Sequence, residues 1–89
     1  MKSARSLFHV LAHRLGRPAS TIHPWHQLER DLDLTPLELV LVALEMEGIE
    51  DVDIDVRGLE RVRTVDDLAT FFMREVAHAR QARMDLEVA

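Results

Sequence analysis

The stretch "DLDLTPLELVLVALEMEG" (residues 31–48) contains the clearest helix start in the chain. Thr35 and Glu38 have the spacing of a capping box, in which the threonine oxygen accepts a backbone N–H and the glutamate reaches back. Pro36 falls at the first helical position, where its missing N–H costs nothing and its fixed φ suits the helix. The pattern therefore predicts a helix over 36–47 that stops at the glycine after it.

A first helix is predicted on the N-terminal side of this stretch. Apolar side chains recur at helical spacing over 3–15, and Gly16 is a stop signal. Residues 17–34 are irregular, and we expect four apolar residues to hold this long loop on the core. They are Ile22, Trp25, Leu28 and Leu32. Trp25 is expected to be a buried plug beneath the loop.

The C-terminal half predicts a short helical turn and a last helix. In "IEDVDIDVRGLERV" (residues 49–62) apolar and acidic residues alternate, and a single run without a partner strand makes a poor sheet. This favours an extended loop that leads into a short helical turn. Thr64 is a second N-cap residue, so a last helix should begin at Val65 and extend past Arg80.

Length and composition indicate one small globular domain. The chain has 89 residues, of which 47% are apolar and 30% charged. We expect an all-α domain over 1–89, a four-helix bundle with a long loop between the first two helices and a short third helix. Its core should span about 3–78, and residues 79–89 should fray.

Charge is unevenly distributed around the net value of −5. Residues 29–67 carry thirteen acidic and four basic side chains, which disfavours nucleic acid and favours a protein partner with basic patches. The chain has no cysteine, so disulfides and thiolate metal sites are excluded. "SLFHVLAH" (residues 6–13) is too short and polar for a signal or membrane segment, so we expect a cytoplasmic protein without a membrane partner.

Two partial metal patterns lack essential ligands. His9 and His13 lie one helical turn apart, but "HVLAH" has no glutamate between them as a metalloprotease helix requires. The acidic loop that starts at Asp51 has the first spacings of a calcium loop. Val56 and Val62, however, stand where such a loop needs glycine and glutamate. We therefore expect solvated histidines, a solvated acidic loop and no metal.

Four segments of the chain resemble the acyl carrier protein family. "LFHVLAHRLG" looks like the first helix of the family, and "LERDLDL" is similar to the segment before the attachment site. "PLELVLVALEMEGIEDVDI" resembles the second helix with the loop after it, and "TVDDLATFF" the start of the last helix. The register holds without gaps from Ile22 to Phe72. The resemblance implies the family's four-helix bundle and a protein that is not an enzyme.

The attachment site of the family is the point at which this chain differs. Family members attach phosphopantetheine to the serine of an Asp-Ser-Leu triplet at the start of helix 2. In the gapless register Thr35, Pro36 and Leu37 stand there, with Pro36 in the serine's place, and a two-residue shift puts Leu34 there instead. The chain's serines are Ser3, Ser6 and Ser20. The resemblance therefore implies a degenerate attachment site, no cofactor and a non-catalytic interaction or regulatory module.

Two alternatives to this interpretation stay open. One is a functional acyl carrier that takes its prosthetic group at an unusual residue such as Thr35. The other is a homodimeric structural protein that buries the apolar excess of the second helix.

The resemblance also implies that the second helix presents acidic residues to protein partners. The partner would be a synthase, ligase or related enzyme of fatty-acid or polyketide-type synthesis, with a basic or apolar docking patch. The expected contact residues are Glu38, Leu41, Glu45, Glu47, Asp51, Asp53 and Asp55. Leu41 belongs to an apolar run wider than the stripe of roughly 100° that a bundle helix needs. It therefore either faces a partner or is covered by a loop.

Overall fold

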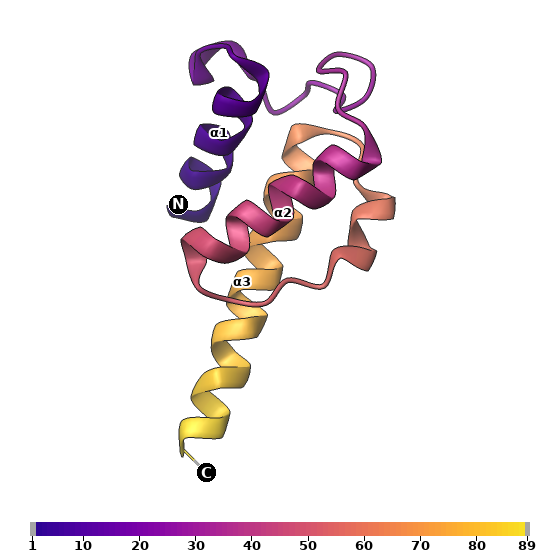
Figure 1. Cartoon of the computed structure of the whole chain (residues 1–89). Coiled ribbons are helices and arrows are strands. Elements are labelled where there is room, and N and C mark those ends of the chain that lie inside the picture. Colours follow the sequence, from indigo (N-terminus) through magenta and orange to yellow (C-terminus); the bar gives the residue numbers. More distant parts are fainter. Residues whose placement is uncertain (1, 89) are drawn as a thin grey trace.

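A computed structural model describes residues 2–88 of the chain, and the side-chain environment of residues 4–85. Its elements in chain order are α1 (Lys2–Leu15), η1 (Ala19–Thr21), α2 (Pro36–Glu50), η2 (Val56–Arg61) and α3 (Val65–Val88) (Figure 1). In the described part, extended backbone pairs only at an isolated bridge between Gln27 and Thr64. The predicted all-α fold is confirmed, with η2 as its short third helix.

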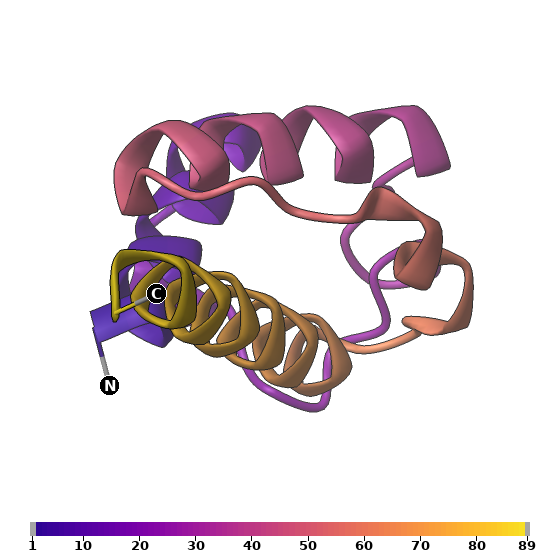
Figure 2. The ribbon, with the colours of Figure 1, turned by 90° about the horizontal axis from the view of Figure 1, so that it is seen from below.

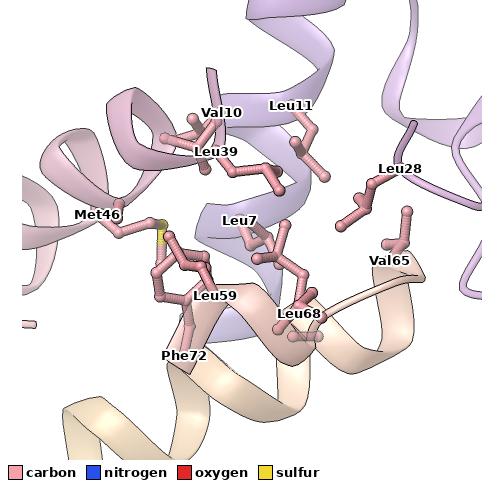
Figure 3. Packing of buried hydrophobic residues seen from close by; sticks show 14 of the residues in the cluster. Leu7, Val10, Leu11, Leu28, Leu39, Met46, Leu59, Val65, Leu68 and Phe72 are labelled. Atoms are coloured by element: carbon pink, nitrogen blue, oxygen red, sulfur yellow. The ribbon is translucent and has the colours of Figure 1, made fainter. Parts of the chain in front are cut away.

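The core lies where α1, α2 and α3 meet. Leu7 of α1, Met46 of α2 and the α3 residues Leu68 and Phe72 are fully buried. Their side chains point toward one another in Figure 3. Leu59 brings η2 onto the same core, and η2 contacts both α2 and α3. The apolar face of each helix is thus buried against the others, which supplies most of the stability of so small a bundle.

The long loop before α2 is attached to the start of α3 by backbone hydrogen bonds. The Val65 N–H donates to the His26 carbonyl oxygen, and the Leu28 N–H donates to the Arg63 carbonyl oxygen, both at 2.9 Å. Three of the four apolar residues expected to hold this loop are buried. They are Ile22, Leu28 and Leu32.

Trp25 is the exception, because its side chain is 70% exposed. The Asp66 N–H donates to the carbonyl oxygen of the neighbouring Pro24 at 2.9 Å, so main-chain groups attach this part of the loop to α3. The indole lies outside this contact and stacks on the His23 ring, with centroids 4.5 Å apart and planes 1° from parallel. The predicted buried plug is therefore wrong.

The helix α2 continues past the glycine at which the sequence predicts its end. Gly48 is helical, and α2 ends at Glu50, followed by Asp51 with a left-handed φ of 54°. The Asp51 N–H donates to the Glu47 carbonyl oxygen and closes the last turn. The Glu50 side chain is buried and pairs with Arg80 of α3 at 2.7 Å. This tertiary contact favours one more helical turn than the local signal predicts, so the predicted stop is wrong.

The helix α3 projects beyond the rest of the bundle (Figure 1). Its predicted start at Val65 and its continuation past Arg80 are confirmed. The backbone is helical through Val88. The fraying expected over 79–89 stays a prediction. Residues 1 and 89 of the predicted domain lie outside the described residues. None of the described helices has a long enough apolar stretch to cross a membrane.

Candidate functional site

The start of α2 is built by the capping residues that the sequence predicts. Thr35 precedes the helix with extended backbone, and its Oγ1 accepts the Glu38 N–H at 3.1 Å. The same hydroxyl donates to Glu38 Oε1 at 3.2 Å, so the glutamate reaches back to the side chain of the cap. Pro36 is the first helical residue. The Thr35 cap is confirmed, whereas Glu38 bonds to the Thr35 hydroxyl rather than to its backbone N–H; this hydroxyl is thus engaged as both donor and acceptor.

No serine lies at this end of α2. Ser3 and Ser6 belong to α1, and Ser20 belongs to η1. Pro36 has no hydroxyl, and the Thr35 hydroxyl stabilises the helix end. The first turn of α2 is therefore arranged as a helix start and offers no unengaged alcohol for covalent attachment.

A pocket of about 570 Å³ lies beside Pro36, between α2 and η2. Its other apolar walls are Leu28, Leu34, Leu39, Val40, Val56, Leu59 and Val62. Four exposed charged residues also line it. They are Glu29, Arg57, Glu60 and Arg63. Such a lining can bury an apolar group and orient a polar one at the opening. The sequence analysis missed this pocket because its walls come from separate segments that meet only in the fold.

Gly58 allows η2 to approach α3 closely. A Cβ atom at this position would lie 2.5 Å from Cε1 of Phe71, well inside van der Waals contact. A larger residue would therefore displace the Phe71 ring or move η2, which carries one wall of the pocket.

The three predicted contact glutamates of α2 differ in what they contact. The Glu45 carboxylate pairs with the Arg14 guanidinium of α1 at 2.8 Å. Glu47 Oε2 accepts the Ile54 N–H at 2.7 Å, and Glu38 belongs to the helix cap. Among the described residues, no cation lies within ion-pair distance of Glu38 or Glu47. Both half-buried carboxylates therefore lack a counterion from the described part of the fold, and that of Glu47 is held by the Ile54 N–H.

The acidic loop after α2 is partly used by the fold itself. The Asp51 carbonyl oxygen accepts a hydrogen bond from Arg83 Nη2 at 2.8 Å. Asp55 accepts the Arg57 guanidinium at 2.7 Å. The side-chain and then the backbone hydrogen bonds from Arg57 lower the pKa of Asp55 to about 2, because they stabilise the carboxylate. Asp53 is exposed. Sequence reasoning missed these arginine contacts because the pattern of acids says nothing about their partners.

Three leucines face outward from α2. Leu37 is 69% exposed, Leu44 is 53% exposed, and Leu41, the residue singled out from the sequence, is 37% exposed. Figure 2 shows α2 along one edge of the molecule, with no described segment over its outer side. The alternative that a loop covers this face is therefore contradicted. The sequence pattern could not separate Leu37 and Leu44 from the buried Leu39, because apolar residues surround this helix on nearly all sides.

The histidines of α1 are solvent-exposed. His9 and His13 lie on the outside of the helix, which agrees with the expectation of solvated side chains. Within the described residues, no three or more His, Cys, Asp or Glu side chains are placed to hold a metal ion.

Comparison with known proteins identifies the family of the chain. No protein-family model matches it. Acyl carrier protein 3 of Ralstonia nicotianae (strain ATCC BAA-1114 / GMI1000) is 32% identical over 69 residues, which are 78% of this chain and 79% of that protein. The chain belongs to the acyl carrier protein family. The resemblance to this family is thereby confirmed.

Membership of the acyl carrier protein family gives the observed surfaces a context. Acyl carrier proteins are carriers rather than catalysts, so a carrier-domain function and a protein partner in general go with the family. The helical bundle described above is consistent with that fold. At the start of α2 this chain has Thr35, Pro36 and Leu37.

Proposed function

We propose that this chain is an acyl carrier protein family member that carries no phosphopantetheine and acts by docking to a protein partner. The observation that carries the proposal is Pro36 at the first position of α2, next to a Thr35 hydroxyl engaged in the helix cap. These residues do not fit attachment of a phosphopantetheine arm, because no unengaged alcohol is present there. No group-transfer step is therefore assigned to this protein.

The proposed docking surface is the outer face of α2 with the acidic loop after it. Its members Leu41 and Asp53 are exposed and Glu38 and Glu47 are half-buried, and these four are the residues we expect to contact a partner. Glu45, Asp51 and Asp55 were also predicted as contacts. The ion pairs of Glu45 with Arg14 and of Asp55 with Arg57 leave these two less available, whereas the Asp51 side chain is exposed and its main-chain carbonyl oxygen accepts the hydrogen bond from Arg83. The proposed partner has a basic or apolar patch, because that surface complements acids around exposed leucines.

The proposed role is to occupy, scaffold or regulate an enzyme of fatty-acid or polyketide-type synthesis in the cytoplasm. A synthase, a ligase or a related enzyme fits this role, and the protein itself would perform no catalysis. Two alternatives make different predictions. A functional carrier would be loaded at an unusual residue such as Thr35, and a homodimer would bury the apolar face of α2 against a second copy.

Intact-mass measurement tests the absence of the arm. The protein is incubated with coenzyme A and a broad-specificity phosphopantetheinyl transferase, beside a functional acyl carrier protein as positive control. We expect the mass of the wild type to stay unchanged while the control gains one group. A gain by the wild type that is lost in Thr35→Ala would overturn the proposal and support attachment at Thr35.

Affinity capture from the native host tests the docking role. The wild type and Leu41→Glu are used as baits at equal amounts, and captured proteins are identified by mass spectrometry. We expect the wild type to retain a synthase, a ligase or a functional acyl carrier, and Leu41→Glu to retain much less of it with unchanged helix content. Capture of only unrelated proteins, or of the protein itself, would argue that the fold is used outside this chemistry.

A further inference from the structure

A row of basic side chains runs along the outer side of α1, a helix at one edge of the molecule (Figure 1). Residues 1–28 contain four basic residues, four histidines and no acidic residue. Three of these residues recur at every fourth position and are exposed. They are Arg5, His9 and His13, which we call the basic row. At about 100° and 1.5 Å per residue, each lies roughly 40° around the helix and about 6 Å along it from the one before.

An open hollow of about 480 Å³ adjoins the basic row at the end of α1. His9, His13 and Arg17 contribute to its lining. Arg17 Nε donates to Thr21 Oγ1 at 2.8 Å, and Arg17 Nη2 donates to the Thr21 carbonyl oxygen at 3.0 Å. These two hydrogen bonds hold the guanidinium beside the histidines. A negatively charged group in the hollow would therefore meet a cation that is already in place.

The fold supplies no acidic partner to the basic row. In the described part of the chain, no carboxylate lies within ion-pair distance of it, whereas the neighbouring Arg14 pairs with Glu45 at 2.8 Å. Helix stability accounts for only one member. The helix dipole favours a cation such as His13 in the last turn, but Arg5 lies in the first turn, where a cation is disfavoured. The charge of the row is thus available to another molecule.

From this arrangement we propose that the basic row binds an acidic helix of a partner protein. Carboxylates at every fourth position of such a helix are also about 6 Å apart, so each can face one member of the row. Nucleic acid and anionic membranes fit less well, because so extended an anion would also meet the acidic region 29–67. The inference goes beyond the proposed docking through α2, since it concerns another helix and the opposite charge, and it does not depend on a missing arm.

The two histidines of the row should make this binding depend on pH. Histidine changes its charge between about pH 8 and pH 5, whereas glutamate on an exposed helix stays ionised over most of that range. The charged groups around the histidines are Arg5, Arg17 and the pair of Arg14 with Glu45. In the described part of the chain, neither α2 nor α3 places a carboxylate within ion-pair distance of either histidine. We therefore expect tighter binding at pH 6 than at pH 8.

Two peptides of equal composition and net charge test the proposal with the full chain. One has three glutamates at every fourth position on one face, and the other has them on different faces. Both are stapled into helices, because like charges four residues apart destabilise a free helix. Fluorescence anisotropy of the labelled peptides measures binding, and amide chemical shifts locate it.

We expect the one-face peptide to bind at least about fivefold more tightly, to shift the amides of α1 and to weaken as salt is raised. Its affinity should rise at least about threefold from pH 8 to pH 6. Equal binding of the two peptides, or shifts confined to other elements, would overturn the proposal.

Matched histidine variants locate the contact. His78 is also exposed, but it belongs to α3 and not to the basic row. The double variant His9→Gln with His13→Gln should bind the one-face peptide at least about threefold more weakly at pH 6 and lose most of the pH dependence. His78→Gln should bind as the wild type does, and circular dichroism checks that both variants keep their helix content. Equal weakening by the two variants would contradict a site at the row.

The outcomes separate this inference from the proposed function. Loading of the wild type with phosphopantetheine overturns the proposed function and leaves the basic row as a binding site. A folded, unloaded protein that binds neither peptide overturns this inference alone. Sedimentation of the wild type at pH 6 should give the mass of a monomer. Self-association that the double histidine variant abolishes would assign the basic row to the acidic surface of a second copy and contradict the proposal.

Discussion

The two ends of α2 are held by different kinds of interaction. At the N-terminal end, Thr35 and Glu38 lie three residues apart and cap the helix with exposed hydrogen bonds. At the C-terminal end, the buried Glu50 pairs with Arg80, thirty residues further along the chain, and the helix persists past Gly48. A local cap is therefore readable from sequence, whereas a contact across the fold becomes visible only when α3 is placed.

The residues of α2 that affect stability differ from those that we expect to affect docking. The exposed cap should contribute little, because its groups can bond to water instead, whereas removal of Arg80 would leave a buried carboxylate without its partner. The exposed Leu41 and Leu44 between the two ends take part in neither interaction. Substitutions there should therefore change docking with little effect on folding.

The largest effect is expected at the C-terminal end of α2. We expect Arg80→Leu to lower the free energy of unfolding by about 2 kcal/mol, because Glu50 then remains buried and unpaired. The value is below the roughly 3–5 kcal/mol of a fully buried pair, since the Arg80 side chain is half exposed. Urea denaturation measures the loss. The double variant Glu50→Leu with Arg80→Leu should recover part of it, and a double variant no more stable than Arg80→Leu would contradict this account of the pair.

The N-terminal cap should show a smaller effect. We expect Thr35→Ala to lower the free energy of unfolding by about 1 kcal/mol, because the Glu38 N–H loses its acceptor. Thr35→Ser should retain most of the stability, and urea denaturation compares the two. A loss for Thr35→Ala as large as that for Arg80→Leu would remove the contrast between the two ends.

The Pro36→Ser substitution should lower the stability of the protein no more than Thr35→Ala does. Proline at the first helical position has a fixed φ that suits the helix, and the N–H that it lacks has no partner within the helix there. Its loss should therefore lower stability by about 1 kcal/mol or less, which thermal melting would measure. The folded variant then reports on the attachment site. Loading by the transferase would mean that only the hydroxyl is missing, and failure to load would mean that the recognition surface has also diverged. An unfolded Pro36→Ser protein would refute the view of Pro36 as a helix starter.

The smallest effect is expected at the local pair of Asp55 and Arg57. The pKa of Asp55 in the folded protein is about 2, below its ordinary value of 3.8. The carboxylate therefore stabilises the fold above about pH 4, and this contribution is lost as the pH falls through about 2. Both side chains are largely exposed, so the contribution is small. Titration of the Asp55 carboxyl by NMR checks the pKa, and a value near 3.8 would show that the pair does not persist in solution.

Much of the fold was predictable because its signals are local. The caps at Thr35 and Thr64 each use groups within three residues, so both helix starts could be placed from the sequence. Trp25 could not be placed in this way, because its loop is attached to α3 by a hydrogen bond between Pro24 and Asp66, which are far apart in the chain. Long-range contacts of this kind leave no spacing pattern to read.

The candidate site was predictable only in part. Apolar residues surround α2 on nearly all sides, so periodicity cannot separate the buried Leu39 from the exposed Leu37 and Leu44. Glu45 and Arg14 meet only when α1 packs on α2, and the sequence therefore overstated how much charge that glutamate offers a partner.

The mass of the protein isolated from its own cells tests the central claim most directly. Those cells supply whatever transferase and coenzyme the protein meets, so its covalent state there is the relevant one. We predict an intact mass without a phosphopantetheine group. A mass increased by one such group, assigned by fragmentation to Thr35 or to any other residue, would contradict the claim that this acyl carrier protein fold works without its arm.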